Sequence, residues 1–413
     1  MRTRYGISPW IDLTPKSRVP DYSRFRGAHT ADVVIIGGGL TGCATAYACA
    51  LAGIKTIVLD ADRVGQGSGG RSAGLLLPDP GPAFRDIEQL HGLRAARTAF
   101  HSWRRASLEG AALLRRLNIT CGLEPVTPLI VADRFDPSTP LGAGDKTLRR
   151  EFDARSKAGV GGTWLARKLL ASLTVPEVPA AMRMRDAFIL DPYRACLGLS
   201  AAAASRGAMI FERSRVKNVK VARRHVDVIA EGGQVRASTV IVATGTATME
   251  FRQLRRHFKR RESYLVLTEP MPAAIRKQLG GRGTTFKDTR DPHRRVRFTG
   301  DDRILVSGAT QDETPERKRP AILVQRTGQL MYELLTMFPA ISGLMPEYGW
   351  DVISGETADG LMYIGPHRNY PRHLFALGSG GDSVTGAFLA ARLLVRALQD
   401  AHEKEDAVWS WTR

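Results

Sequence analysis

Three glycines near the start of the chain carry the clearest chemical signal in the sequence. Gly37, Gly39 and Gly42 fill the spacing G-x-G-x-x-G directly after a β-branched run at residues 32–36. In this pattern the first glycine allows a tight turn, the second lets backbone approach a diphosphate, and the third lets a helix pack closely on a strand. The small residues that follow predict that helix, whose N-terminus favours an anion. The spacing therefore predicts a diphosphate-binding turn.

An acidic residue follows these glycines at the expected place. A second β-branched run, residues 56–59, ends at Asp60, which completes the order strand, turn, helix, strand, acid. Asp60 is positioned to accept hydrogen bonds from a ribose hydroxyl. We therefore predict that residues 31–60 bind an adenine dinucleotide, with further contacts from Leu40, Thr41 and Ala61.

Length and composition limit the kind of protein. At 413 residues the chain exceeds one typical domain core, so two or three lobes are expected. Residues 1–30 hold no apolar signal-peptide region, and no apolar run reaches the roughly 18 residues of a membrane span. We expect no bound metal and a reducing, cytoplasmic compartment, because the cysteines form no C-x-x-C pair and no metal spacing. The four expected buried thiols are Cys43, Cys49, Cys121 and Cys196.

Positive charge is unusually abundant and unevenly distributed. The net charge is +19, and residues 251–303 carry 15 Lys or Arg against 6 Asp or Glu. Its densest part, residues 252–261 (called the basic run below), is either a solvated helical face or a surface for an anionic membrane, an acidic partner or an acidic substrate. No nucleic-acid motif accompanies the charge, so specific nucleic-acid binding is not expected.

Three later segments help to decide which dinucleotide is bound. Residues 65–74, GQGSGGRSAG, form a second glycine-rich loop on which a ligand can lie against backbone. Residues 240–245, VIVATG, are a strand that ends in Thr-Gly. Residues 374–398 predict a strand, a glycine turn and a helix, so that a second helix N-terminus points out of a sheet.

With these segments the chain resembles the superfamily of FAD-dependent D-amino acid oxidases and glycine oxidases. The resemblance covers nearly the whole chain beyond residue 30 and includes LDPYRACLGLSAAAASRGA, VIVATG, SYLVLTEP and TADGLMYIGP. SPWID and SYLVLTEP are most similar to the γ-glutamylputrescine oxidase branch. The resemblance implies an α/β fold, in which a Rossmann-like FAD-binding domain is interleaved with an α+β substrate domain that carries an antiparallel sheet.

The same resemblance implies the domain organisation. The FAD-binding domain is expected to be discontinuous, built from residues 31–85, 160–250 and 341–413. The substrate domain is expected from residues 86–159 and 251–340, and residues 1–30 form an extension that becomes ordered on contact. Residues 91–117 have the apolar spacing of a helix, whereas SYLVLTEP, RVRFT and RILVSGAT predict antiparallel strands that roof the flavin.

The resemblance also implies how FAD lies in the protein. Its diphosphate is expected on residues 37–42, its isoalloxazine along residues 71–75 and its pyrimidine end at the turn 380–385. A helix N-terminus there would stabilise the negative charge of a reduced flavin. The remaining expected contacts are Ser68, Arg71, Ser72, Ala73, Gly74, Leu75, Val216, Ala243, Thr244, Gly245, Gly380, Gly381, Asp382, Ser383, Val384 and Thr385.

Two departures refine the cofactor prediction. Family members that attach flavin covalently use a histidine in the second glycine loop or a late cysteine, and this chain has neither, so we expect non-covalent FAD. Residues 142–144 and 159–162 lack the third glycine and the strand–helix setting of an NAD(P)H site. The substrate itself is therefore expected to reduce the flavin.

Histidine placement bears on the reaction. Amine oxidation is driven by the nitrogen lone pair once the amine is deprotonated, so no protein base is obligatory. Alcohol oxidation usually needs a base, typically histidine. His257 and His293 lie in basic loops, and His367 and His373 lie in a polar turn, so none is an obvious base. The pattern favours C–N over C–O oxidation.

Several side chains are candidates for substrate binding. Arg295 and Arg297 share one face of a strand, where they either clamp a carboxylate or point outward. Glycine-oxidase-like members carry a substrate arginine where this chain has Ser354, which argues against simple α-amino acids. Asp382 either pairs with a cationic substrate or caps a helix. The remaining candidates, chosen by position, are Tyr264, Glu356 and Tyr363.

The sequence thus favours a FAD-dependent oxidoreductase that oxidises a C–N bond of an amine or substituted amino acid. Hydride would pass to flavin N5, and the imine would then be hydrolysed. Oxygen and another electron acceptor both remain open. Two alternatives also remain: a flavin-linked 2-hydroxyacid or alcohol dehydrogenase, docked to an anionic membrane through the basic run, and a non-catalytic FAD-bound assembly or scaffold protein.

Overall fold

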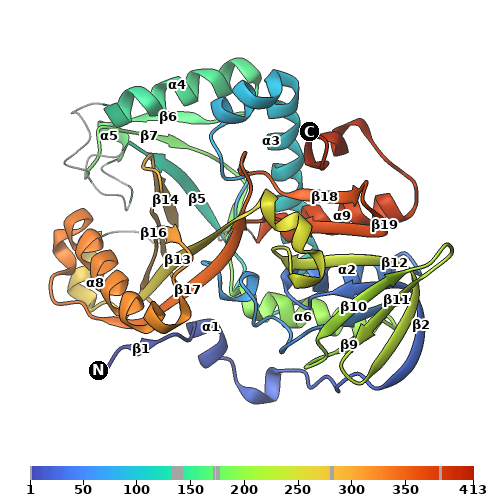
Figure 1. The fold of residues 1–413 in the computed structure, drawn as a ribbon. Helices are drawn as coiled ribbons and strands as arrows, with labels where there is room; N and C mark the ends of the chain where they lie inside the picture. Colours follow the sequence, from blue (N-terminus) through green and yellow to red (C-terminus); the bar gives the residue numbers. More distant parts are fainter. Residues whose placement is uncertain (1, 133–142, 171–172, 174–176, 280–282, 381–383) are drawn as a thin grey trace.

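Two β-sheets organise the chain, and helices cover each of them (Figure 1). The computed structural model describes residues 2–132, 143–170, 173, 177–279, 283–380 and 384–413. The helices are α1 (Pro9–Asp12), α2 (Leu40–Leu51), α3 (Phe84–Arg116), α4 (Ala143–Ala158), α5 (Arg167–Leu170), α6 (Pro192–Ala204), α7 (Ala273–Leu279), α8 (Arg319–Met337) and α9 (Thr385–Leu398).

The sheet that carries the glycine motif, called the parallel sheet below, has the strand order β10-β11-β12-β2-β3-β9 with β18 and β19 joined at β12. Its strands are β2 (Gly27–Ile36), β3 (Thr56–Leu59), β9 (Met209–Phe211), β10 (Val216–Val221), β11 (Val226–Ala230), β12 (Gly233–Gly245), β18 (Tyr363–His367) and β19 (Tyr370–Leu377). β2 pairs in parallel with both β3 and β12. The buried Val and Ile runs of these strands suit a sheet covered on both faces.

Helices α2, α6 and α9 pack together against the parallel sheet, and α3 lies beside α9. The apolar spacing predicted a helix at residues 91–117, and α3 covers all of this range except Leu117, its C-cap. Gly92 interrupts α3 with a non-helical backbone conformation, φ 80° and ψ 164°, so that a first segment from Phe84 meets the longer segment at a kink. Glycine adopts this positive φ without a steric penalty.

The second sheet, called the roof sheet below, has the order β1-β17-β13-β16-β15-β14-β5-β7-β6, with β4 and β8 attached. Its strands are β1 (Arg4–Tyr5), β4 (Leu75–Leu76), β5 (Glu124–Val131), β6 (Thr163–Ala166), β7 (Ala180–Arg183), β8 (Ala187–Ile189), β13 (Lys259–Thr268), β14 (Thr284–Asp288), β15 (Arg295–Phe298), β16 (Ile304–Asp312) and β17 (Pro346–Glu356). The three strands predicted from SYLVLTEP, RVRFT and RILVSGAT are β13, β15 and β16, and they pair antiparallel as expected.

Helix α8 covers one face of the roof sheet (Figure 1). Leu330 and Leu334 of α8 pack on Tyr264, Val266 and Val306 of the sheet. Successive side chains of a strand point to opposite faces, so the residues between these positions face the interior of the protein. That second face is the one that roofs a cavity, as described below.

Sheet membership differs from the predicted domain ranges in all three ranges predicted for the FAD-binding domain. β4 lies within residues 31–85, β6 to β8 lie within residues 160–250 and β17 lies within residues 341–413, yet these strands belong to the roof sheet. Their partners are distant in sequence, and strand pattern alone does not identify a partner. The predicted N-terminal extension also ends earlier, because β2 already begins at Gly27.

The N-terminal extension contacts the roof sheet and the second glycine loop. β1 pairs in parallel with β17, and the Trp10 indole N–H donates to Ser72 O at 2.9 Å. Tyr348 donates its hydroxyl to Asp12 at 2.8 Å. The extension therefore connects the second glycine loop to the roof sheet, and its becoming ordered on contact stays a prediction.

A buried ion cluster joins the start of α3 to the second half of α4. Arg155 donates to Glu151 at 2.7 Å and to Asp79 at 2.9 Å, and all three side chains are more than nine-tenths buried. Glu151 also accepts the backbone N–H of Phe84 at 2.7 Å and that of Arg85 at 3.3 Å. A carboxylate at this position satisfies the unpaired N–H groups at the start of α3.

We predict that Glu151→Ala lowers the free energy of unfolding by about 3 kcal/mol, because it leaves Arg155 partly uncompensated and the α3 N–H groups unpaired. Asp153→Ala is the matched control, since Asp153 forms an exposed pair with Arg149 at the same spacing in the same helix. Its expected loss is under about 0.5 kcal/mol. Urea unfolding measures both values, and equal losses would contradict the prediction.

Candidate functional site

A cavity of about 480 Å³, called the glycine-loop cavity below, opens where β2, β3 and β12 end and α2 begins. The carboxyl ends of parallel strands are the usual ligand-binding edge of such a sheet. Eleven of the 23 predicted cofactor residues line it. They are Gly37, Gly39, Leu40, Thr41, Asp60, Ala61, Ser68, Val216, Ala243, Thr244 and Gly245.

The three glycines of the motif differ in their surroundings. A Cβ added at Gly42 would lie 1.8 Å from Gly37 O, so α2 can approach the turn only with glycine here. Gly37 has φ +106°, and an added Cβ would lie 2.7 Å from Ala243 O. At Gly39 an added Cβ would meet nothing within 4 Å, because this glycine faces the cavity. These surroundings match the packing, turn and ligand-approach roles of the pattern.

Asp60 is held rigidly at the wall of the glycine-loop cavity. Its Oδ2 accepts the backbone N–H of Gly38 at 2.5 Å, and its Oδ1 accepts that of Asp62 at 2.7 Å. Burial raises the pKa of Asp60, although these hydrogen bonds oppose that effect. A carboxylate has about four acceptor positions, so it can also accept from a ligand hydroxyl.

The second glycine loop leads from this cavity to a larger one. Its backbone is held by side chains from three distant segments. Trp350 donates to Arg71 O at 2.7 Å, Trp10 donates to Ser72 O, and Arg297 donates to Gly74 O at 2.7 Å. Arg71, Ser72, Ala73 and Gly74 line neither cavity, and their contact with a cofactor stays a prediction.

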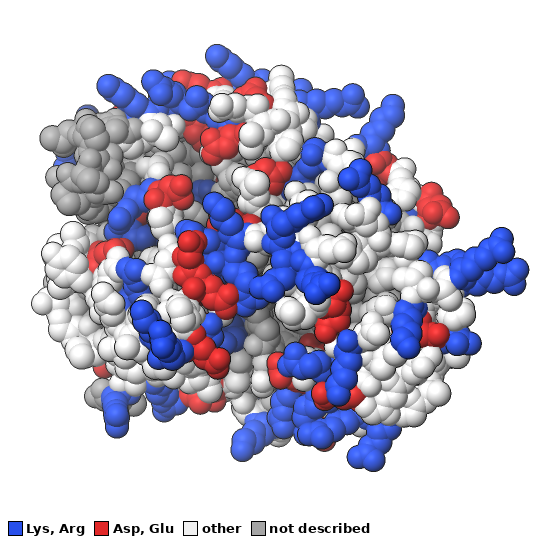
Figure 2. Space-filling model, viewed as in Figure 1, with Lys and Arg blue, Asp and Glu red and all other residues white. Residues whose placement is uncertain are grey.

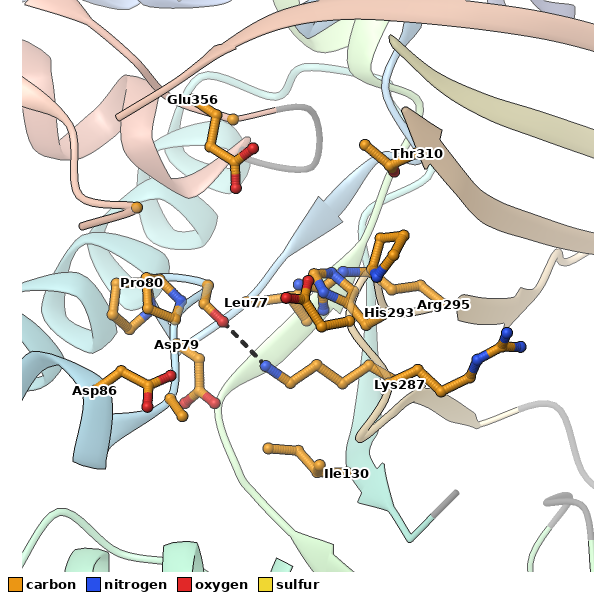
Figure 3. A pocket seen from close by; sticks show the side chains of 18 of the residues that line it. Leu77, Asp79, Pro80, Asp86, Ile130, Lys287, His293, Arg295, Thr310 and Glu356 are labelled. Atoms are coloured by element: carbon orange, nitrogen blue, oxygen red, sulfur yellow. Dashed lines mark hydrogen bonds between the residues drawn. The ribbon is translucent and has the colours of Figure 1, made fainter. Parts of the chain in front are cut away.

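The larger cavity, called the roof cavity below, has a volume of about 590 Å³. Strands β13 to β17 of the roof sheet form one side of it, and residues 75–86, 357–360 and 378–380 form another (Figure 3). Ser379 lines both cavities, so an elongated ligand can extend from one into the other. The two cavities together fit a molecule with a diphosphate, a ribose and a large ring system.

The predicted flavin turn is only partly described. Gly380, Thr385 and Leu75 line the roof cavity, and Thr385 Oγ1 both donates to Leu77 O and accepts from Leu77 N at 2.9 Å. Val384 is buried and lines neither cavity. The predictions for Gly381, Asp382 and Ser383 lie outside the described residues.

Of the two candidate arginines, the structure brings one to the cavity. Arg295 lines the roof cavity (Figure 3). Arg297 extends from the same face of β15, but it donates to Gly74 O and Leu190 O and lies over the Trp10 ring. Arg297 therefore fits neither alternative, a carboxylate clamp or an outward-facing pair, because it is buried and does not line the roof cavity with Arg295. Arg297 supports the second glycine loop because those backbone carbonyls lie within its reach.

The two candidate tyrosines also lie away from the roof cavity. Tyr264 is buried beneath α8, where Gln311 donates to its hydroxyl at 3.0 Å. Its neighbour Ser263 faces the cavity instead, because side chains alternate along β13. Tyr363 stacks on Trp411 at 4.3 Å between ring centroids. Placing either tyrosine in the cavity was wrong, since strand faces and the path of the C-terminal segment were unknown.

Glu356 and Ser354 line the roof cavity, and so do two residues that sequence reasoning missed. Lys287 extends along the cavity from β14, and His293 lies in the loop that follows (Figure 3). The sequence signal that could have identified Lys287 is a lysine inside the short strand TTFKD, whose other residues are buried in β14. From the sequence none of the histidines was an obvious base, but the structure places His293 in the lining of the roof cavity.

The basic run reaches both cavities. Arg255 and Arg260 line the glycine-loop cavity, and Arg261 lines the roof cavity, 3.3 Å from Glu356. On the face of the molecule that Figure 2 shows, Lys and Arg side chains gather with acidic ones near the middle. Contact of the run with an anionic membrane or an acidic partner stays a prediction.

An arginine of the C-terminal segment holds the wall of the roof cavity. Arg413 donates to both oxygens of Asp359, at 2.7 and 2.9 Å, and to Leu361 O and Met362 O. Burial alone would raise the pKa of Asp359, but the hydrogen bonds and charge of Arg413 outweigh burial and lower it to about 2. Asp359 also contacts His91 at 2.9 Å, so it joins three segments.

Two further findings concern the described residues only. They contain no helix that is both long and apolar enough to cross a membrane. They also contain no group of three His, Cys, Asp or Glu side chains that could hold a metal ion. All four cysteines are buried, as expected.

Comparison with known proteins agrees with this geometry. The family model DAO, described as FAD dependent oxidoreductase, matches residues 32–397. The chain is 26% identical to γ-glutamylputrescine oxidoreductase of Escherichia coli K12 over 400 residues, which cover 92% of this chain and 86% of that protein. It is 25% identical to the probable oxidoreductase OrdL of Haemophilus influenzae over 385 residues, or 91% and 84% of the two chains.

Solved structures show the same fold. Glycine oxidase from Geobacillus kaustophilus superposes with a TM-score of 0.76 at 18% identity, over 93% of this chain and 99% of that one. These matches confirm the predicted superfamily, the similarity to the γ-glutamylputrescine branch, and the α/β fold class.

We predict that Gly42→Ala lowers FAD affinity at least about tenfold and the free energy of unfolding by about 1–3 kcal/mol, because the added methyl group forces α2 away from Gly37. Gly328→Ala is the control. Gly328 lies in α8, where an added Cβ would meet nothing within 4 Å. Flavin fluorescence on dilution measures the affinity, and equal affinities for the two variants would contradict the role of Gly42.

The Asp359 pair predicts a specific acid dependence of stability. Because its folded-state pKa lies below the ordinary value of about 3.9, the pair stabilises the fold above pH 4, and this contribution is lost as the pH falls toward 2. Arg413→Met should therefore be less stable than wild type at pH 7, and the difference should shrink between pH 4 and 2. Urea unfolding across this range is the measurement. The exposed Lys404→Met is the control, and a constant difference would oppose the prediction.

Proposed function

The chain belongs to the family of FAD-dependent oxidoreductases, and from that premise we propose that it oxidises a C–N bond of an amine or a substituted amino acid. FAD is its cofactor. Bound in the two cavities, FAD would accept a hydride from the carbon beside the substrate nitrogen, and the imine product would then be hydrolysed. Attachment of FAD without a covalent bond stays a prediction.

The observation that carries this proposal is the charge pattern of the roof cavity. Its lining joins the glycine-loop cavity at Ser379 and combines acidic side chains with basic ones. Asp86 and Glu356 lie on parts of the wall different from Lys287 and Arg295 (Figure 3). Such a lining can attract an ammonium group on one side and an anionic group on another.

The chain's own residues would bind and orient the substrate in this site. The roof sheet excludes water from one side of the cavity, and Arg413 keeps the segment around Asp359 in place on another. Holding the reacting carbon close to the cofactor is itself a large part of catalysis. The relatives named for γ-glutamylputrescine and glycine support an amine or amino acid as the substrate.

A second candidate is oxidation of a 2-hydroxyacid or another alcohol. The observation that favours it is His293 in the cavity lining, because a histidine can accept the hydroxyl proton during alcohol oxidation. The chain belongs to a family of oxidoreductases, which favours an enzyme over the non-catalytic scaffold alternative.

Anaerobic mixing of the holoenzyme with amines, N-substituted amino acids and 2-hydroxyacids tests the proposal. We expect amines or amino acids, and not hydroxyacids, to bleach the visible absorbance band of the flavin. The variant His293→Asn should still be bleached by the same compounds. Bleaching by hydroxyacids alone, abolished in His293→Asn, would replace the proposal with the second candidate. A flavin absorbance that no amine or amino acid bleaches would also count against the proposed oxidation of a C–N bond.

A further inference from the structure

A third cavity, called the arginine cleft below, is distinct from the two cavities described above. It has a volume of about 280 Å³ and opens where α3, the last turn of α4 and the end of β7 meet (Figure 1). Among the described residues it shares only Asp79 and Arg155 with the roof cavity, and it shares none with the glycine-loop cavity. A ligand in the arginine cleft would therefore be bound outside the site assigned to FAD and substrate.

The lining of the arginine cleft is strongly basic. Its described residues include one carboxylate, Asp79, against four arginines and one histidine. Two of the arginines are already paired, Arg155 with Asp79 and Arg104 with Asp186 at 2.6 Å. These two arginines hold neighbouring segments together, so the capacity to bind an anion lies mainly in the other two, which are Arg183 and Arg185.

Arg183 and Arg185 are the cations of the cleft that remain available. Arg183 ends β7 opposite Thr163 of β6, and the exposed Arg185 follows two residues later. In the part of the chain that the structure describes, neither side chain has a hydrogen bond or an ion pair. A guanidinium group is a rigid fork of N–H donors that matches the oxygens of an anion. Two such forks in one cleft suit an anion that presents several oxygens.

A glycine turn at residues 159–162, GVGG, adds backbone donors to the same cleft. Gly161 and Gly162 both line it, with φ +91° and +138°. Their N–H groups have no hydrogen-bond partner among the described residues. A Cβ added at Gly161 would meet nothing within 4 Å, so the backbone there is open to a ligand. Turns that present successive backbone N–H groups are known anion-binding features.

We propose that the arginine cleft binds a phosphate group, with Arg183 and Arg185 as its charged partners and the turn at Gly161 and Gly162 as its backbone partner. A phosphate suits this donor set better than a carboxylate, because it carries nearly two negative charges at neutral pH and three strong acceptor oxygens. Free phosphate and a small phosphate ester share this chemistry. The cleft is too small for a second dinucleotide.

His101 of α3 supplies a signature of occupancy. Burial, and then the positive charges of Arg97 and Arg104, lower the pKa of His101. A bound phosphate would place negative charge among these groups, which favours the protonated imidazole and should raise the pKa of His101. The other charged residues that line the cleft are Asp79, Arg155, Arg183 and Arg185.

Isothermal titration calorimetry of the holoenzyme tests the proposal, because bound FAD keeps added phosphate out of the diphosphate turn. Inorganic phosphate, ethyl phosphate and acetate are titrated at neutral pH and constant ionic strength. We expect both phosphate compounds to bind at least about tenfold more tightly than acetate. Tighter binding of ethyl phosphate would identify an ester as the ligand, and tighter binding of the inorganic ion would identify free phosphate. Equal binding of phosphate and acetate would overturn the proposal.

Variants locate the binding site. Arg183→Gln/Arg185→Gln should weaken phosphate binding at least about tenfold. Arg223→Gln/Arg224→Gln is the matched control, because it removes the same charge from two exposed arginines between β10 and β11 that line none of the three cavities. Equal weakening in both would show a response to net charge alone and reject the site. Should the first variant fail to fold, Arg185→Gln alone, outside β7, should still weaken binding several-fold.

Proton NMR of the histidines connects binding to the cleft, with His101→Asn used to assign the His101 signal. Saturating phosphate should raise the pKa of His101, whereas acetate at the same ionic strength should not. Phosphate binding that leaves the pKa of His101 unchanged would place the ion elsewhere and contradict the proposal. None of these measurements uses flavin reduction, so their outcome is independent of the proposed oxidation of a C–N bond.

Discussion

The close contact between α2 and the turn at Gly37 is the constraint on which the rest of the site depends. With only 1.8 Å between Gly37 O and the Cβ that Gly42 lacks, any larger residue would push the helix away from the strand. Its N-terminal N–H groups would then no longer face the cavity, where they favour a diphosphate. The parallel pairing of β2 with β3 and β12 sets the same turn beside Asp60 and Gly245.

The second half of the site depends on how the roof sheet distributes its charges. Arg295 and Arg297 leave β15 on one face, yet one lines the cavity and the other holds the backbone of Gly74. Arg155, Asp79 and Glu151 form a buried cluster that joins α3, α4 and the cavity wall. The charged groups of this cavity are therefore largely held by structural contacts, and Lys287 too donates to a backbone carbonyl, that of Gly81.

Local signals predicted the residues whose roles depend on near neighbours. The glycine spacing, Asp60 and the strand ending at Gly245 all line one cavity, as the sequence indicated. Predictions that needed the direction of a side chain were less successful. Tyr264 and Ser263 are adjacent, and only the position of α8 decides that the tyrosine is covered and the serine faces the cavity. Lys287 was missed because its cross-strand neighbour Arg295 and the cavity wall around it come together only after folding.

The sequence by itself determined the glycine turn and the acid that follows it, because a strand, a glycine turn, a helix and an acid act over about 30 residues of continuous chain. The family and the FAD cofactor followed from a resemblance that covers nearly the whole chain beyond residue 30. Only the tertiary structure decided which charged groups line the roof cavity. Those groups come from α4, β14, β15 and β17, whose pairing and strand faces bring distant residues together. A residue's chemistry there is set by burial and by neighbouring charges, which no local spacing specifies.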